Sequence, residues 1–288
     1  MVKLLGALAP AKINLFLRVT GQRANGYHEL DSVFLPLALS DRVGLAFRSA
    51  PDCAVQLRCD WPELGPAAEN LAVRAAYAFM QEFAIRGEVS IDLRKSIPAG
   101  AGLGGGSSDG ATVLRLLAEL FGVADADRLA ALALSLGADV PFFLTAAPAR
   151  VRGIGERIEP LRGFRPFALV VAVPPLTVST AAVFAGLRSE DWSGPASDEA
   201  LAAMAAGSIA PGLLVNDLAA VAIKQWPLIA ELKTMVEACG AAGASMTGSG
   251  GAVFGIFATP AAAETAAEQV RRRYPAVRVF ATTTFRGP

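Results

Sequence analysis

Apolar residues occupy every second position from Ile13 to Val19, which predicts a strand with one buried face. Lys12 and Asn14 then point to the same side of this strand, because successive side chains alternate across a sheet. Similar apolar runs, bounded by turn residues such as Asn25-Gly26, predict further strands and one hairpin. The strands are expected at residues 33–37, 43–47, 55–59, 89–93, 168–173 and 277–280, and the hairpin at 246–257.

Apolar residues spaced three or four positions apart predict helices in both halves of the chain. Asn70 can cap the first of them, and Gly122 ends the second, which contains Val113–Phe121. Residues 188–212 are rich in Ala, Ser, Gly and Asp and are expected to form a surface excursion. The remaining helices are expected at residues 127–136, 180–187, 216–225, 228–239 and 261–273. Mixed strands and helices predict an α+β fold rather than a regular βαβ alternation.

Length and composition limit the classes of protein that this chain can belong to. Its 288 residues suggest two domains at about 100–200 residues each, and the pattern divides them as 1–160 and 161–288. The formal net charge is zero and no basic run stands out, which argues against a nucleic-acid partner. Three cysteines and one histidine form no disulfide framework and no metal-ligand spacing. No stretch reaches the length of a membrane helix, and a cytoplasmic protein is expected.

The most informative segment lies between the strand that ends near Lys95 and the second helix. It consists of Pro98, Ala99, Gly100, Ala101, Gly102, Leu103, Gly104, Gly105, Gly106, Ser107 and Ser108. Glycines let backbone N–H groups converge on one point, and a helix start adds unpaired donors and partial positive charge. Ser107 and Ser108 can cap the helix or contact a phosphate or a metal. The segment predicts a phosphate-binding loop, with a flexible surface loop as the alternative.

Three familiar phosphate loops do not account for this segment. Gly100, Gly102 and Gly105 satisfy G-x-G-x-x-G, yet a dinucleotide-binding unit needs a second parallel strand ending in an acidic residue about 20 positions later. Here one helix leads directly to another, and Glu119 lies inside the first. The Gly-Lys-Ser/Thr of a Walker A loop and the motifs of protein kinases are absent.

A fourth pattern does match. The loop resembles the Pro-x-x-x-Gly-Leu-Gly-(Gly/Ser)-x-Ser-Ser motif of the GHMP kinases, the family of galactokinase, homoserine kinase and mevalonate kinase. Residues 9–15 are similar to the N-terminal motif of that family and residues 246–254 to its C-terminal glycine motif. Two departures are visible: Asp109-Gly110 stands where Asn-Ala is expected, and Gly251 stands where Ala is common.

The resemblance implies a two-domain fold with the active site in the cleft between a ribosomal S5-like N-terminal domain and a ferredoxin-like C-terminal domain. It implies phosphoryl transfer from ATP to an alcohol, with Lys12 and Asp139 as the catalytic pair and residues 98–108 around the phosphates. Mg²⁺ is expected with ATP, although no residue of the sequence specifies its ligands. A carboxylate can take the proton of the alcohol, and a lysine can stabilise developing negative charge.

Other segments resemble one branch of the family, which phosphorylates the 2-hydroxyl of 4-diphosphocytidyl-2-C-methyl-D-erythritol. They are Lys12–Leu17 followed by Gly26–Leu30, the triple glycine at 104–106, and residues 137–143. In that branch Tyr27 and His28 would contact the cytosine ring, and Phe184 would stack on its other face. The substrate cleft would also contain Asn14, Thr180, Gly248, Ser249 and Gly250.

From the residues alone, simpler interpretations stay open. Asp139 is equally well explained as a loop cap, and a solvated strand lysine is the better default for Lys12. Tyr27 and Phe184 could be ordinary core residues. Alternatives for the whole chain are another GHMP kinase acting on homoserine or mevalonate, an RNA-associated binding protein, and an NAD enzyme. The Tyr27-His28 pair argues against the first, the neutral charge against the second, and the helix-to-helix connection after the loop against the third.

Overall fold

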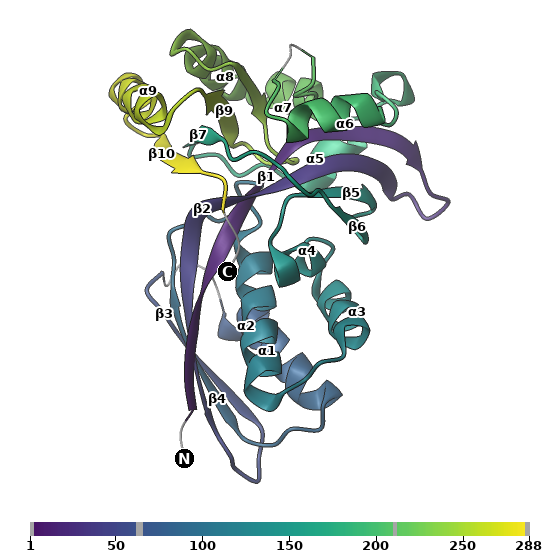
Figure 1. Cartoon of the computed structure of the whole chain (residues 1–288), viewed down its shortest axis with the longest axis vertical. Coiled ribbons are helices and arrows are strands. Elements are labelled where there is room, and N and C mark those ends of the chain that lie inside the picture. Colours follow the sequence, from purple (N-terminus) through teal and green to yellow (C-terminus); the bar gives the residue numbers. More distant parts are fainter. Residues whose placement is uncertain (1–2, 62–65, 210–211, 286–288) are drawn as a thin grey trace.

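Two long antiparallel strands form the backbone of the molecule in the computed structural model, which describes residues 3–61, 66–209 and 212–285. They are β1 (Lys3–Gln22) and β2 (His28–Arg48), and they run through both halves of the fold (Figure 1). The two strands expected at residues 33–37 and 43–47 are one continuous strand. The polar Ser40-Asp41 step does not break it, because the buried Asp41 carboxylate finds partners inside the fold.

A six-stranded sheet forms the first half of the fold. Its order is β3-β4-β2-β5-β6, and β1 pairs along β2. Helices cover one face of this sheet in Figure 1, and the side chain of Asn70 caps the first of them by accepting from the N–H of Ala72, as predicted. The further elements of this half are β3 (Ala54–Cys59), η2 (Ala67–Glu69), α1 (Leu71–Glu82), β4 (Glu88–Arg94), α2 (Gly105–Phe121), α3 (Ala126–Leu136), α4 (Val140–Thr145), β5 (Ala149–Gly153) and β6 (Arg157–Pro160).

A four-stranded antiparallel sheet of order β10-β7-β9-β8 forms the second half. Its elements are β7 (Ala168–Val173), α5 (Thr180–Ala185), η3 (Ser189–Asp191), α6 (Asp198–Ala205), α7 (Ala219–Gln225), α8 (Leu228–Ala238), β8 (Gly243–Met246), β9 (Val253–Phe257), α9 (Pro260–Arg273) and β10 (Arg278–Thr283). The predicted α+β class is confirmed. The domain boundary between residues 160 and 161 stays a prediction, although β6 and β7 lie on either side of it.

The expectation of a single buried face on β1 is wrong. Ile13 and Leu15 pack into a core that includes Val171 and Phe254 of the C-terminal sheet. Lys12, on the other face, is only 4% exposed. The face of Ile13 and Leu15 is covered both by the C-terminal sheet and by Ala101 and Leu103, and the opposite face carries the buried Lys12 and Asn14. Period-two alternation cannot reveal a layer contributed from far along the sequence.

The segment expected to be a surface excursion, residues 188–212, lies largely at the surface but is also anchored to the core; residues 210–211 lie outside the described part of the chain. This segment contains η3 and α6, and it contributes buried residues to the core, namely Ala196, Leu201 and Met204. Asp31 on β2 accepts from the N–H of Ala196, and Arg150 donates to both Asp31 and the carbonyl of Ala196. These buried polar contacts hold the segment against the sheet.

Candidate active site

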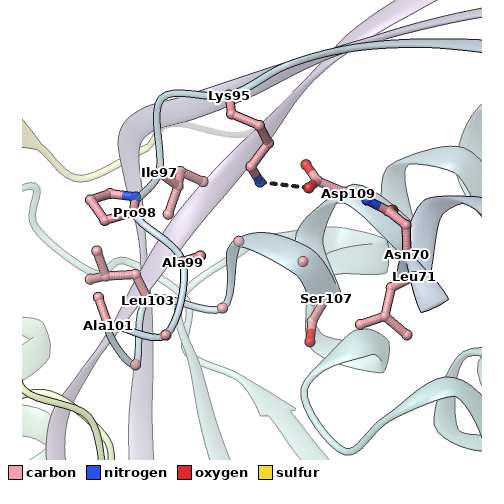
Figure 2. Close-up of a pocket in the computed structure, with 15 residues that line it drawn as sticks. Asn70, Leu71, Lys95, Ile97, Pro98, Ala99, Ala101, Leu103, Ser107 and Asp109 are labelled. Atoms are coloured by element: carbon pink, nitrogen blue, oxygen red, sulfur yellow. Dashed lines mark hydrogen bonds and ion pairs between the residues drawn. The ribbon is translucent and has the colours of Figure 1, made fainter. Parts of the chain in front are cut away.

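Residues 98–108 are here called the phosphate loop, and residues 98–107 of it line a cavity of about 370 Å³ (Figure 2). Gly100, Gly102 and Gly104 have φ angles of 69°, 77° and 71°, in the left-handed region that glycine adopts without strain. Helix α2 begins at Gly105, so the last four residues of the predicted loop form its first turn. The N–H groups of a first helical turn have no partners inside the helix and carry a partial positive charge. The cavity therefore lies where an anion is stabilised.

Neither Ser107 nor Ser108 caps helix α2, which is the role that the sequence suggested for them. Gly104 is the N-cap of α2, and no side chain caps this helix. Ser107 lines the cavity. Ser108 is fully buried, and within the described part of the chain its hydroxyl has no hydrogen-bond partner. A buried hydroxyl without a partner is uncommon, so Ser108 leaves a donor and acceptor available at the base of the loop.

The two glycine motifs of the sequence pack directly against each other. A Cβ added to Gly102 would lie 2.7 Å from the carbonyl oxygen of Thr247. A Cβ added to Gly250 would lie 2.6 Å from the backbone nitrogen of Gly102 and 2.7 Å from the carbonyl carbon of Ala101. The C-terminal motif thus needs glycine in order to support the phosphate loop. Contact of Gly248, Ser249 and Gly250 with the substrate stays a prediction.

Lys12 and Asp139 lie together beside the loop. The N–H of Lys12 donates to the carbonyl of Leu103 at 2.9 Å, which ties β1 to the loop. The side-chain Nζ of Lys12 lies 3.5 Å from Oδ2 of Asp139. Gly104 leaves room for this side chain, since a Cβ there would lie 3.1 Å from Cγ of Lys12. Asp139 precedes α4 but does not cap it, and 35% of its side chain is exposed. The loop-cap interpretation of Asp139 is therefore wrong.

A network of polar side chains orients the ammonium of Lys12. Asn14 accepts from Lys12 Nζ through Oδ1 at 2.7 Å and donates to Ser32 through Nδ2 at 2.9 Å. The N–H of Asn14 donates to Oγ1 of Thr247 at 2.9 Å. The predicted neighbourhood of Lys12 and Asn14 is confirmed. Sequence reasoning missed Ser32 and Thr247, although Thr247 lies inside the C-terminal glycine motif.

Asn216 is a second polar residue that sequence reasoning assigned only to a helix start. The helix begins at Ala219, which leaves the Asn216 side chain free for long-range contacts. Its Nδ2 donates to the carbonyls of Met246 and Gly248 at 2.8 and 2.9 Å. Asn216 therefore holds the glycine turn that supports the phosphate loop.

The residues predicted to bind the cytosine ring are brought together only in part. The rings of His28 and Phe184 stack at 5.2 Å between centroids, at the edge of a separate cavity of about 500 Å³. Tyr27 is 61% exposed, and the structure pairs its N–H with the side chain of Asn25. Thr180, at the start of the helix that carries Phe184, shares a hydrogen bond of 2.7 Å with Ser249.

A buried ionic cluster lies behind the phosphate loop. Lys95 contacts Asp41 and lies 2.6 Å from Oδ2 of Asp109, and all three side chains are buried (Figure 2 draws the contact with Asp109). Asp41 also accepts from the N–H groups of Ser96 and Ile97, just before the loop. The cluster therefore joins β2, the entrance of the loop and the first turns of α2. It also gives Asp109, where Asn is expected, a cationic neighbour.

Burial raises the pKa of Asp109 to about 7. The positive charge of Lys95 lowers this pKa, but the negative charge of Asp41 raises it and offsets part of the effect of Lys95. Burial by itself lowers the pKa of Lys95, but the two carboxylates outweigh it and raise that pKa. One ammonium shared by two buried carboxylates leaves one of them poorly compensated.

The raised pKa of Asp109 predicts a falling stability with rising pH. Between its ordinary value of 3.8 and about 7, the folded protein holds a proton that the unfolded chain has released. We expect the unfolding free energy contributed by this group to fall by about 1 kcal/mol per pH unit across that window. Asp109→Asn should remove this slope. Urea unfolding at pH 5, 6 and 7 measures it.

The matched control for this experiment is Asp92→Asn, which changes an exposed aspartate on β4. This variant should keep the slope of the original protein. Parallel stability curves for the original protein and for Asp109→Asn would show that Asp109 does not titrate in this range.

Two family models match the chain: "GHMP kinases N terminal domain" over residues 70–146 and "GHMP kinases C terminal" over residues 199–276. Together they cover more than half of the chain. The first contains the phosphate loop and Asp139, and the second contains Asn216 and the glycine turn. This protein belongs to the GHMP kinase family.

Curated relatives narrow the assignment. The chain is 42% identical over 269 residues to a 4-diphosphocytidyl-2-C-methyl-D-erythritol kinase of Syntrophotalea carbinolica. The matched region covers 92% of this chain and 94% of the relative. It is 42% identical over 273 residues to the kinase of the same name from Thermus thermophilus, with 92% of each chain covered. Within the GHMP family the chain therefore groups with the 4-diphosphocytidyl-2-C-methyl-D-erythritol kinases.

Solved structures agree with this grouping. A crystal structure of 4-(cytidine 5'-diphospho)-2C-methyl-D-erythritol kinase superposes with a TM-score of 0.85 at 42% identity, covering 97% of this chain and 98% of the other. A homoserine kinase from Cytophaga hutchinsonii superposes with a TM-score of 0.75 at 15% identity, covering 99% and 95%. The second likeness shows the fold alone.

Proposed function

We propose that this protein transfers the γ-phosphoryl group of ATP to the 2-hydroxyl of 4-diphosphocytidyl-2-C-methyl-D-erythritol, in the non-mevalonate route to isoprenoid precursors. The observation that carries the proposal is the pairing of Lys12 and Asp139 at 3.5 Å beside a glycine loop at a helix start. The relatives of 42% identity that bear this substrate in their names support the choice of alcohol.

In the proposed reaction, the 2-hydroxyl oxygen forms a bond to the γ-phosphorus while the bond from that phosphorus to the β,γ-bridging oxygen breaks. Asp139 accepts the hydroxyl proton as the new bond forms. Lys12 stabilises negative charge on the transferring group, and Asn14 holds the ammonium in place through the hydrogen bond at 2.7 Å. N–H groups of the phosphate loop bind the β and γ phosphates, because phosphoryl transfer depends chiefly on position and charge neutralisation.

Magnesium is part of the proposal, although no group of three or more His, Cys, Asp or Glu within residues 3–61, 66–209 and 212–285 could hold a metal ion. Mg²⁺ keeps several waters and takes few protein ligands, so the ATP phosphates would supply most of its remaining ligands. Ser107, which lines the cavity, and Ser108, with its unpaired hydroxyl, are the protein groups available to it. When bound, it supplies charge neutralisation on the phosphates.

The second cavity, of about 500 Å³ and here called the nucleobase pocket, supports a cytidyl substrate over homoserine or mevalonate. His28 and Phe184 stack on each other in the wall of this cavity and offer an aromatic surface to a flat base, whereas a small amino acid or hydroxy acid has no use for such a surface. We also propose that the protein acts in the cytoplasm. Its cysteines Cys53, Cys59 and Cys239 are free, which suits a reducing compartment. The described part of the chain contains no helix that could span a membrane.

A coupled assay of ADP release tests the proposed function. The substrates are the cytidyl compound, the same alcohol without its cytidyl group, homoserine and mevalonate, each with ATP and Mg²⁺. We expect efficient turnover of the first alone, because substrate binding far from the reacting hydroxyl contributes to catalysis. Turnover of homoserine or mevalonate without turnover of the cytidyl compound would contradict the proposal.

A further inference from the structure

Trp192 forms a third aromatic wall of the cavity that holds His28 and Phe184. Its ring meets the His28 ring edge to face, with centroids 6.0 Å apart and an interplanar angle of 90°. His28 thus packs between two rings, stacked on Phe184 and edge-on to Trp192. All three residues line the cavity of about 500 Å³. The sequence motifs include His28 and suggest Phe184, but they contain no signal for Trp192.

The indole N–H of Trp192 is a donor without an acceptor. Nε1 is buried, and no hydrogen-bond partner for it lies in residues 3–61, 66–209 or 212–285. A buried indole N–H normally has a partner, because an unpaired buried donor carries the full cost of its lost hydration. Trp192 lines a cavity that also contains polar and aromatic residues, so a ligand bound there is the candidate for the missing acceptor.

The backbone that follows Trp192 is held by two buried aspartates. Asp217 accepts from the N–H of Ser193 at 2.9 Å and from its hydroxyl at 2.5 Å, and it also binds the N–H of Val19 on β1 at 2.7 Å. Three residues further on, Asp31 accepts from the N–H of Ala196 at 2.8 Å. The indole is therefore placed before any ligand arrives, and a preorganised group loses little entropy on binding.

We propose that Trp192 is a substrate-specificity residue of the nucleobase site. It sets the orientation of the His28 ring by edge-to-face packing, and its indole N–H donates to an acceptor oxygen of the cytidyl group. This inference rests on the proposed function and adds a residue to the substrate site. Since Trp192 is far along the chain from the phosphate loop and lines a different cavity, its role concerns the alcohol substrate and leaves ATP binding unaffected.

Steady-state kinetics of two variants provide the first test. Trp192→Phe keeps an aromatic ring and removes the N–H, so KM for the cytidyl substrate should rise about 2- to 10-fold, the value of one neutral hydrogen bond. Trp192→Ala also removes the ring and should raise it about 30-fold or more. KM for ATP should stay within about two-fold in both variants, because the loop cavity is untouched. Trp226→Phe, at the end of α7, is the matched control and should change neither constant.

Intrinsic fluorescence provides a test that leaves Trp192 in place. The double variant Trp61→Phe/Trp226→Phe retains Trp192 alone among the three tryptophans of the chain. Its emission should change on titration with cytidine 5′-diphosphate or the full substrate and should not change with ATP alone. Binding of either compound is measured independently by calorimetry.

The inference is overturned if cytidine 5′-diphosphate or the substrate binds without changing this emission. It is equally overturned if Trp192→Phe and Trp192→Ala keep the KM of the original protein. Failure of the proposed function is a separate result, since the original protein would then not turn over the cytidyl compound at all.

Discussion

Replacing Asp139 by Asn is expected to lower kcat by about 10²- to 10⁴-fold, the usual contribution of a positioned acid or base. The amide has nearly the same shape as the carboxylate but cannot accept a proton. ATP binding should persist, because the phosphate loop and the start of α2 do not depend on Asp139, which makes no capping hydrogen bond to α4. Turnover is measured by ADP release, and ATP binding by calorimetry.

Asp125→Asn is the matched control for this experiment. Asp125 also precedes a helix, but its side chain caps α3 by accepting from the N–H of Arg128. Asn caps helices about as well as Asp, so this variant should keep both its stability and its kcat. If Asp139→Asn kept near-normal turnover, Asp139 would not be the group that accepts the proton.

The second large effect is expected from Gly250→Ala. The φ angle of Gly250 is not in the left-handed region, so any effect comes from the added methyl group, which would lie 2.6 Å from the backbone nitrogen of Gly102. Backbone cannot yield as the tip of a side chain can. We expect a loss of stability of about 1–3 kcal/mol from overpacking and a loss of about 10²-fold in kcat/KM from displacement of the phosphate loop. Urea unfolding and steady-state kinetics measure the two effects.

Gly251→Ala separates this contact from a general intolerance of the turn. A Cβ at Gly251 would lie 3.3 Å from Cγ2 of Val178, a side-chain atom that can shift slightly. Ala is also the residue commonly expected here, so this variant should stay within a few-fold of the original activity. Equal losses in Gly250→Ala and Gly251→Ala would contradict the proposed contact between the two glycine motifs.

The phosphate loop could be predicted from the sequence because its determinants are local. A strand that ends near Lys95, closely spaced glycines and an amphipathic helix define the loop within about 25 consecutive residues, and backbone preferences act over that distance. The exact helix start could not be predicted, because Gly105 and Gly106 are poor helix formers that α2 nevertheless includes. The cap of α1 by Asn70 was predictable for the same local reason.

The ionic cluster and the polar supports of the site could not be predicted. Asp41 and Lys95 approach each other because β2 and β4 pair, and Asn216 reaches the glycine turn across a stretch of 30 residues or more. Trp192 enters the nucleobase pocket because Asp31 and Asp217 bind the segment around it. Each contact joins distant segments, and a single sequence carries no periodic signal for such pairing.

By itself, the sequence determined the family, the α+β class, the phosphate loop and the presence of Lys12, Asn14 and Asp139, since these depend on residue type and on short-range backbone geometry. The tertiary structure alone decided that β1 is buried on both faces, that the two glycine motifs touch, and that His28 rather than Tyr27 stacks on Phe184. The physical reason is that burial and contact depend on which distant surfaces pack together to remove apolar area from water.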